Sequence, residues 1–359
     1  MRRLVMIGTE KGAFFLWGDA SGAHWEIEGP IMKGWKVLDV MLDRRGAPTL
    51  YAAAGSWVYG ATVQISRDWG KTWTQVEHGP VYGKDSGRKL NNIWTIVPGH
   101  ASQPDVLYAG VDEAGLFVSR DRGLHWEELT GVGQHPTRPE WVPGAGGLCC
   151  HSVCVDAKNP DRVWVGISAV GVLRTDDGGA NWAVKNDGLT IIIEAKDNKH
   201  IGSCVHRLVA DPTDPKRLYQ QNHKGVFRSV DAGDTWQRIE NGLEGWFGFP
   251  MVMHPHDPKT LFIVPEETDE FRMPKDGRLT VFRSRDCGDS WEPLRDGLPE
   301  HFYSGVMRQA LAMDGTEAGG VYFGASGGQI FASDDNGDHW RQLPFTLPRI
   351  LSVNAACVD

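Results

Sequence analysis

The sequence predicts an all-β fold: a single seven-bladed β-propeller that spans residues 1–359, with four antiparallel strands in each blade. An eight-residue pattern, Ser/Thr-x-Asp-x-Gly-x-x-Trp, occurs six times along the chain. The tryptophans of these copies and of one degenerate copy are separated by 48, 53, 56, 54, 55 and 49 residues. Short β-branched and aromatic runs fill the intervals between turn residues. A regular period of this length with several short strands per unit is typical of propeller blades.

The repeated pattern predicts a tight turn between two strands. Asp and Ser/Thr side chains accept hydrogen bonds from nearby backbone N–H groups, and Gly adopts positive φ at little cost. The tryptophan then opens the next strand and buries a large aromatic surface. The full copies are SRDWGKTW (66–73), SRDRGLHW (119–126), TDDGGANW (175–182), SVDAGDTW (229–236), SRDCGDSW (284–291) and SDDNGDHW (333–340). The degenerate copy, GDASGAHW (18–25), has Ala20 in place of the aspartate.

One repeat illustrates the expected strands. Residues 205–210, 217–221, 226–230 and 235–240 are runs rich in apolar and β-branched residues, and Pro, Asp, Asn or Gly clusters separate them. Such runs predict four successive strands, with the repeated turn between the third and the fourth.

The two ends of the chain complement each other. Residues 4–8, 13–17 and 25–28 supply the second, third and fourth strands of one blade, and no first strand precedes them. Residues 350–358 read as a first strand with no second strand after it. We therefore expect the C-terminal strand to pair with the N-terminal strands, which closes the ring and removes open sheet edges.

The repeated turn resembles the Asp-box (BNR) repeat of sialidase-like propellers, and the resemblance covers essentially the whole chain. The chain looks most similar to bacterial BNR-repeat proteins of undefined activity. The same repeat occurs in sialidases, xyloglucanases, sortilin-type receptors and photosystem assembly factors, so the resemblance implies a fold rather than a function. The early Arg-Ile-Pro motif of sialidases is absent here, which argues against sialidase activity.

Composition excludes several classes of function. The net charge is −9 and no Lys/Arg run is present, whereas a nucleic-acid partner requires a basic stripe. No segment approaches the roughly 18 apolar residues of a membrane helix. The six cysteines form no C-x-x-C pair, as expected for reduced thiols. We expect a cytoplasmic protein with neither a nucleic-acid nor a membrane partner.

Propeller topology predicts which end of the blades carries function. The repeated turns and the short turns between first and second strands share one end. The long segments 78–91, 131–147, 189–203 and 265–279 connect strands at the opposite end. Long loops on a rigid scaffold are where binding and catalysis concentrate, so we expect the site there.

Three histidines are candidate ligands of a divalent metal or acid–base groups. His151 and His206 each lie five residues before the aspartate that ends a first strand, and His223 lies in a loop at the same end. Imidazole suits both roles near neutral pH. The alternative is that these histidines are polar residues lining the channel or capping loops.

Other candidates lie in the same loops. Glu113 and Glu267 are candidate catalytic carboxylates for glycoside hydrolysis, with solvated loop charge as the alternative. Arginine prefers anionic partners, and aromatic rings stack on sugars or pack beneath loops. The candidate substrate-binding residues are Arg138, Trp141, Arg272, Arg308, Tyr303 and Trp94.

The function predicted on these grounds is a hydrolase or lyase. It acts on a small anionic or carbohydrate-like substrate at the mouth of the channel, with a His-bound divalent metal as the candidate cofactor. One alternative is a non-catalytic scaffold that binds a protein or another ligand. Another is a sialidase-like glycoside hydrolase that uses carboxylates of the loop end.

Overall fold

The computed structural model describes residues 2–358, which form strands and only a few short helices. The helices are α1 (Thr130–Gly133), η1 (Lys84–Ser86), η2 (Arg138–Glu140) and η3 (Lys275–Gly277). None of them, within the described residues, has the length and apolar character needed to cross a membrane. The chain forms two compact units: Met1–Val40 with Gln221–Phe227 and Arg238–Asp359, and Met41–Gln220 with Arg228–Gln237.

The first unit contains an eight-stranded sheet made of two four-stranded groups. Its order is β27-β26-β25-β24-β28-β1-β2-β3, and one parallel pair, Gln309 with Ser352, joins the two groups. The strands are β1 (Arg2–Thr9), β2 (Gly12–Gly18), β3 (Trp25–Ile31), β24 (Val306–Met313), β25 (Val321–Ala325), β26 (Gln329–Ser333), β27 (Arg341–Thr346) and β28 (Ile350–Val358).

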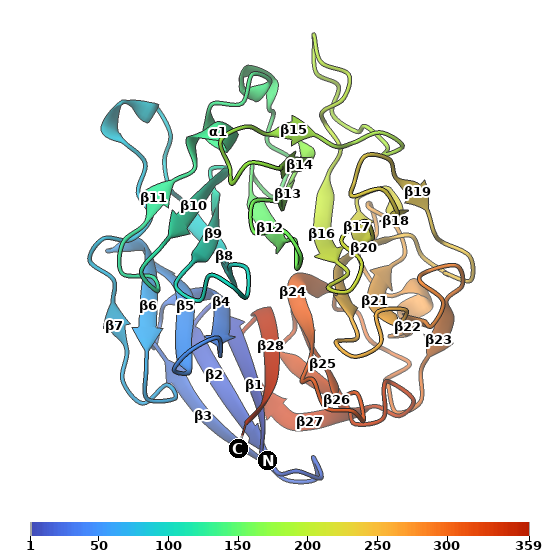
Figure 1. Cartoon of the computed structure of the whole chain (residues 1–359). Helices are drawn as coiled ribbons and strands as arrows, with labels where there is room; N and C mark the ends of the chain where they lie inside the picture. Colours follow the sequence, from blue (N-terminus) through green and yellow to red (C-terminus); the bar gives the residue numbers. More distant parts are fainter. Residues whose placement is uncertain (1, 359) are drawn as a thin grey trace. The chain divides into compact units, whose positions relative to one another are not determined.

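The C-terminal strand completes a group begun by the N-terminus, as the sequence predicts. β28 runs antiparallel to β1, with Arg2 opposite Val358 and Gly8 opposite Ser352. Figure 1 shows the two strands side by side and the chain ends together. The group β28-β1-β2-β3 therefore combines strands from opposite ends of the sequence.

A second sheet of this unit is a separate group of four antiparallel strands. It contains β20 (Phe247–Met253), β21 (Leu261–Glu266), β22 (Val281–Ser284) and β23 (Glu292–Leu294), in that order. Apolar residues of this sheet and of the eight-stranded sheet form one core, in which Phe262 and Phe323 are fully buried. This shared core fixes the loops at the strand ends.

The second unit repeats the same plan. Two of its sheets have four antiparallel strands each, ordered β11-β10-β9-β8 and β12-β13-β14-β15. Their strands are β8 (Asn92–Pro98), β9 (Leu107–Asp112), β10 (Gly115–Ser119), β11 (Glu127–Glu128), β12 (Cys150–Val155), β13 (Val163–Ile167), β14 (Gly171–Thr175) and β15 (Ala183–Val184). The other strands are β4 (Lys36–Asp43), β5 (Thr49–Ser56), β6 (Gly60–Ser66), β7 (Thr74–Gln75), β16 (Val205–Ala210), β17 (Leu218–Asn222), β18 (Gly225–Ser229) and β19 (Gln237–Arg238).

The repeated turns lie between third and fourth strands, as predicted. In the copy between β22 and β23, the Asp286 carboxylate accepts hydrogen bonds from the Ser284 hydroxyl at 2.8 Å and from the Ser290 backbone N–H at 2.9 Å. Gly288 has φ +88°. The Trp291 indole N–H donates to the Ile239 carbonyl at 2.8 Å. These turns are saturated by internal hydrogen bonds, which fits a structural role.

The degenerate copy keeps its turn by moving the carboxylate one residue earlier. Asp19 accepts hydrogen bonds from the Ala23 N–H at 3.1 Å and from the Ser21 hydroxyl at 2.7 Å. The Trp25 indole donates to the Gly22 carbonyl at 2.8 Å. Ala20 is therefore tolerated because its neighbour supplies the acceptor.

Candidate functional site

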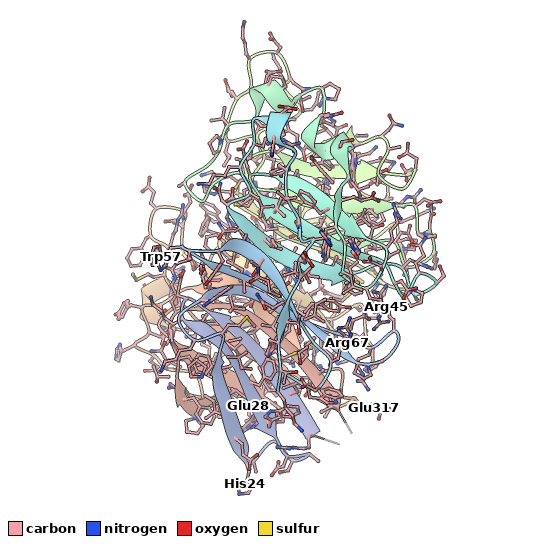
Figure 2. The ribbon with its side chains drawn as sticks, turned by 90° about the vertical axis from the view of Figure 1, so that its left-hand side faces the viewer. His24, Glu28, Arg45, Trp57, Arg67 and Glu317 are labelled. Carbon is pink, nitrogen blue, oxygen red and sulfur yellow. The ribbon has the colours of Figure 1, made fainter. Side chains whose placement is uncertain are left out.

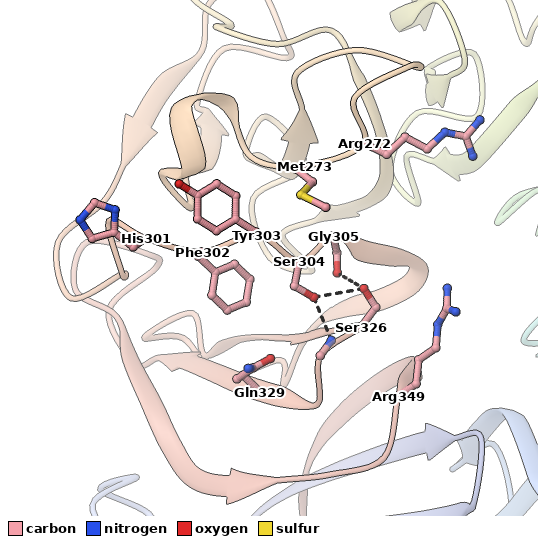
Figure 3. A pocket seen from close by; sticks show the side chains of 11 residues that line it. Arg272, Met273, His301, Phe302, Tyr303, Ser304, Gly305, Ser326, Gln329 and Arg349 are labelled. Atoms are coloured by element: carbon pink, nitrogen blue, oxygen red, sulfur yellow. Dashed lines mark hydrogen bonds between the residues drawn. The ribbon is translucent and has the colours of Figure 1, made fainter.

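An open pocket of about 590 Å³ lies at the loop end of the first unit. Figure 3 shows the residues that line it: Arg272, Met273, His301, Phe302, Tyr303, Ser304, Gly305, Ser326, Gly327, Gln329 and Arg349. Gln329 begins β26, and the others come from the loops β21–β22, β23–β24, β25–β26 and β27–β28. In these antiparallel sheets, such loops lie at the end opposite the repeated turns. The predicted end of the sheets therefore carries a pocket in this unit.

Hydrogen bonds between two loops form the polar floor of the pocket. The Ser326 hydroxyl donates to the Gly305 carbonyl at 2.9 Å, and the Gly327 N–H donates to the Ser304 hydroxyl at 2.8 Å. The two hydroxyl oxygens are 3.2 Å apart. Because the Ser326 proton is already used, Ser304 donates to Ser326. These bonds hold the β23–β24 and β25–β26 loops in fixed register.

Tyr303 gives the pocket an exposed aromatic ring. Its side chain belongs to the β23–β24 loop and is 59% exposed. The ring lies on Gly277, where an added Cβ would approach it to 2.7 Å. The Phe302 N–H donates to the Gly277 carbonyl at 2.7 Å, which ties the two loops together. Gly277, at φ +69°, thus provides the space in which the ring sits.

Glu266 is a buried carboxyl group directly behind the pocket wall. It ends β21 and is only 4% exposed. Its Oε2 has no hydrogen-bond partner among the described residues. Its Oε1 lies so close to Gly305 that a Cβ there would overlap it. Burial raises the pKa of Glu266 to about 7, against the opposing effect of the Arg272 guanidinium, so the group still holds a proton in part near neutral pH.

Asp269, in the loop that follows β21, is a carboxyl group with the opposite pKa shift. Its Oδ2 lies 2.6 Å from the Lys224 Nζ and 3.0 Å from the His223 Nε2. The hydrogen bond from Lys224 is the main cause that lowers the pKa of Asp269. Burial lowers the pKa of His223, although Asp269 opposes this effect. The end of β21 and the loop after it therefore carry two carboxyl groups whose pKa values are shifted in opposite directions.

Two arginines of this unit contact aromatic rings of β20, one from the β21–β22 loop and one from β24. The Arg272 guanidinium lies 5.2 Å from the centre of the Phe247 ring, and its Nε donates to the Asp269 carbonyl at 3.0 Å. Arg308, on β24, lies 5.0 Å from the centre of the Phe249 ring. Of the predicted substrate-binding residues, Arg272 and Tyr303 line the pocket, whereas Arg308 is not among its lining residues.

Three predicted residues meet in the second unit. The Arg138 Nη2 lies 3.0 Å from the Glu113 Oε1, and the guanidinium stacks 4.9 Å from the centre of the Trp141 ring. The Trp141 indole donates to the Thr137 hydroxyl at 2.8 Å. Arg138 and Trp141 are thus engaged within the protein, which fits the packing alternative. Trp94 is half-buried on β8.

The predicted metal ligands have different surroundings. His151, on β12, is fully buried, with its Nε2 2.8 Å from the Val205 carbonyl and its Nδ1 3.0 Å from the Ser152 hydroxyl. With these bonds in place, neither ring nitrogen offers a free lone pair, so metal binding would require them to break. His206 is buried on β16, and His223 contacts Asp269 in the first unit.

The sequence predicted Glu267 as a catalytic carboxylate, whereas the carboxyl group next to the pocket in the structure is that of Glu266. Glu267 is half-buried, and its backbone N–H donates to the Met273 carbonyl at 2.9 Å. Glu266 follows the apolar run Leu261–Pro265 and shares its burial. No signal in the sequence separates Glu266 from Glu267, because a glutamate is rarely fully buried and only the structure shows how deep the end of β21 lies. Ser304, Ser326 and Arg349 gave no signal, since small polar residues and arginine are common in turns.

No family model matches the chain. A probable oligoxyloglucan-reducing end-specific xyloglucanase of Neosartorya fischeri is 26% identical over 193 residues, which are 52% of this chain and 20% of that protein. Xyloglucanase Xgh74A of Acetivibrio thermocellus is 22% identical over 306 residues, covering 71% of this chain and 32% of the relative. The chain thus spans less than one third of the length of these curated relatives.

Solved structures show the same likeness. The GH74 xyloglucanase from Xanthomonas campestris has a TM-score of 0.66 at 19% identity, covering 99% of this chain and 52% of that one. The chain is similar in fold to xyloglucanases. At this identity the likeness establishes the fold, an all-β, propeller-like arrangement of four-stranded sheets.

YCF48 bound to D1 peptide has a TM-score of 0.54 at 18% identity, covering 85% of this chain and 81% of that one.

Proposed function

We propose that this chain is a glycoside hydrolase that binds a carbohydrate in the pocket around Tyr303. The observation that carries the proposal is the pocket itself. It contains an exposed tyrosine, Tyr303, whose ring lies against Gly277 and is surrounded by polar groups. Aromatic rings present an apolar face on which a sugar ring can stack. The similarity to xyloglucanases along part of their length supports the same class of ligand.

Two carboxyl groups with different protonation support the hydrolytic step. Glycoside hydrolases use one carboxylic acid that protonates the leaving oxygen and one carboxylate that acts as base or nucleophile. Environments that separate the two pKa values assign these roles. Glu266, with its pKa raised to about 7, is the proposed proton donor; because it lies behind Gly305 and does not line the pocket, it would act through one bridging water. Asp269, with its lowered pKa, is the proposed ionised partner.

We also propose that the sheets form the full seven-bladed ring predicted from the repeats. The six complete copies and the degenerate copy supply seven turns of one kind. The pairing of β28 with β1 joins the first strand of one blade to the remaining three. A closed ring would hold the loops on a rigid base.

The test is the release of reducing sugar from a panel of polysaccharides. The panel contains xyloglucan, other neutral glucans and acidic polysaccharides. Glu266→Gln is compared with Glu267→Gln, which alters the adjacent carboxyl group. We expect Glu266→Gln to lower kcat at least 100-fold and Glu267→Gln to change it less than threefold, because general acid catalysis contributes about 10²–10⁴-fold. Absence of hydrolysis and of saccharide binding across the panel would refute the proposal.

A protein- or peptide-binding scaffold is the second candidate, and one feature favours it. The tip of the β5–β6 hairpin exposes Trp57 by 98%, Val58 by 57% and Tyr59 by 66%, and Figure 2 labels Trp57. The fold is shared with YCF48, which has been solved bound to a peptide. Peptide binding abolished by Trp57→Ala, in a protein without hydrolytic activity, would establish this function instead.

A further inference from the structure

We propose that Arg272 and Arg349 form an anion-binding subsite that selects an acidic saccharide, one that carries a carboxylate on its sugar ring. This inference rests on the proposed carbohydrate-binding function and names the substrate class of the same pocket. The two side chains belong to different loops, β21–β22 and β27–β28, and both line the pocket.

Both guanidinium groups lack a carboxylate partner among the described residues. Arg272 uses its Nε for the Asp269 carbonyl, which leaves both Nη groups for a ligand. Among the described residues, the Arg349 side chain has one polar contact, a weak one from its Nη2 to the Met307 sulfur at 3.8 Å. By contrast, Arg295 in the same unit lies 2.6 Å from the Glu244 carboxylate. Arginine binds carboxylates through its paired N–H groups. Two guanidinium groups without a carboxylate partner at one pocket therefore indicate an anionic ligand.

The neighbouring acidic groups do not neutralise these arginines. The Glu266 carboxyl is buried behind Gly305. The Asp269 carboxylate is occupied by Lys224 and His223. Both arginines are exposed to solvent. The residues that line the pocket therefore include two arginines and no carboxylate, in a protein whose overall charge is −9.

The side chains that line the pocket are arranged for a ligand with a sugar ring at one end and a negative charge at the other. Figure 3 shows Arg272 and Arg349 on one side of Ser304 and Gly305, with Tyr303 and His301 on the other. A sugar ring stacked on Tyr303 would thus direct an acidic neighbour toward the arginines. Neutral saccharides would leave both guanidinium groups without a partner, so the subsite discriminates by charge.

The test measures binding of two probes by isothermal titration calorimetry. One is a trisaccharide of α-1,4-linked galacturonic acid, and the other is its methyl ester, in which the same sugars carry no charge. We expect the acid to bind at least tenfold more tightly at low salt, with the preference falling as ionic strength rises. Arg272→Gln and Arg349→Gln should each weaken binding of the acid about tenfold and leave the ester unaffected.

Arg278→Gln is the matched control, because Arg278 is exposed near the same loop but does not line the pocket. It should leave both affinities unchanged, and thermal melts should show that every variant is folded. Equal binding of acid and ester, or unaltered acid binding in both arginine variants, would overturn the subsite. If neutral polysaccharides are hydrolysed in that case, the proposed function still stands. If no saccharide binds or is hydrolysed, both proposals fail.

Discussion

The carboxyl group of Glu266 lies against the backbone of Gly305, with no room for a Cβ between them. Glu266 ends β21, whereas Gly305 belongs to the β23–β24 loop and lines the pocket. The absence of a side chain at position 305 therefore allows a buried carboxyl group to lie directly behind the wall of the site.

Gly305→Ala tests this relationship. The added methyl group would overlap the Glu266 Oε1, so we expect the free energy of unfolding to fall by about 1–3 kcal/mol. Chemical denaturation measures this change. The cost should shrink in a Glu266→Ala background, because the overlapping carboxyl group is then absent. Gly327→Ala is a suitable control, since its contact at 2.6 Å is with the end of the flexible Gln329 side chain. An equal cost in both backgrounds would contradict the contact.

Glu266 should make the free energy of unfolding fall as the pH rises from 4.5 to 7. Its pKa is raised from 4.5 to about 7 in the folded protein, so between these values the folded state binds more protons than the unfolded state. Stability contributed by this group is therefore fully present below pH 4.5 and is lost as pH rises through 7. Glu266→Gln should remove this dependence and stabilise the protein at pH 8 by on the order of 2–3 kcal/mol relative to wild type. Denaturant titrations from pH 4 to pH 8 provide the measurement, and parallel pH profiles for the two proteins would disprove the assignment.

Asp286→Ala should affect stability without affecting the pocket. Partial burial raises the pKa of Asp286. Hydrogen bonds from Ser290 and Ser284 outweigh this effect and hold the pKa below its usual value. The carboxylate therefore stabilises the turn above about pH 4, and this contribution disappears as the pH falls through its folded pKa. We expect a loss of about 1 kcal/mol at pH 7, seen as a lower Tm. Saccharide binding should stay within twofold of wild type, since the turn lies at the opposite end of its sheet. A variant that binds poorly while melting normally would place function at this turn.

His151→Ala distinguishes a structural histidine from the metal ligand predicted from the sequence. Removing the buried ring leaves a cavity and strips partners from the Val205 carbonyl and the Ser152 hydroxyl. We expect the free energy of unfolding to fall by about 2–4 kcal/mol, with the metal content of the purified protein unchanged by elemental analysis. Loss of one equivalent of metal at unaltered stability would instead support the metal site.

Much of the secondary structure could be predicted because its signals are local. Each copy of the repeated pattern carries its own acceptors and glycine, so the turn at 284–291 forms where the sequence places it. The predicted strand at residues 350–358 is observed as β28. The degenerate copy of the turn is a case that the local pattern does not predict. The pattern marks Ala20 as a missing acceptor, and only the fold reveals that Asp19 takes its place.

The amino-acid sequence by itself determined the period, the turns, the pairing of the chain ends and the end of the sheets where long loops gather. These properties depend on residues close together in the chain or on regular spacing. Only the tertiary structure decided which loop residues meet. Glu266 and Gly305, 39 positions apart in the sequence, come into contact because the end of β21 and the β23–β24 loop meet over a shared core. A carboxyl group's burial, and hence its protonation, depends on neighbours distant in sequence, so no local pattern distinguishes Glu266 from Glu267.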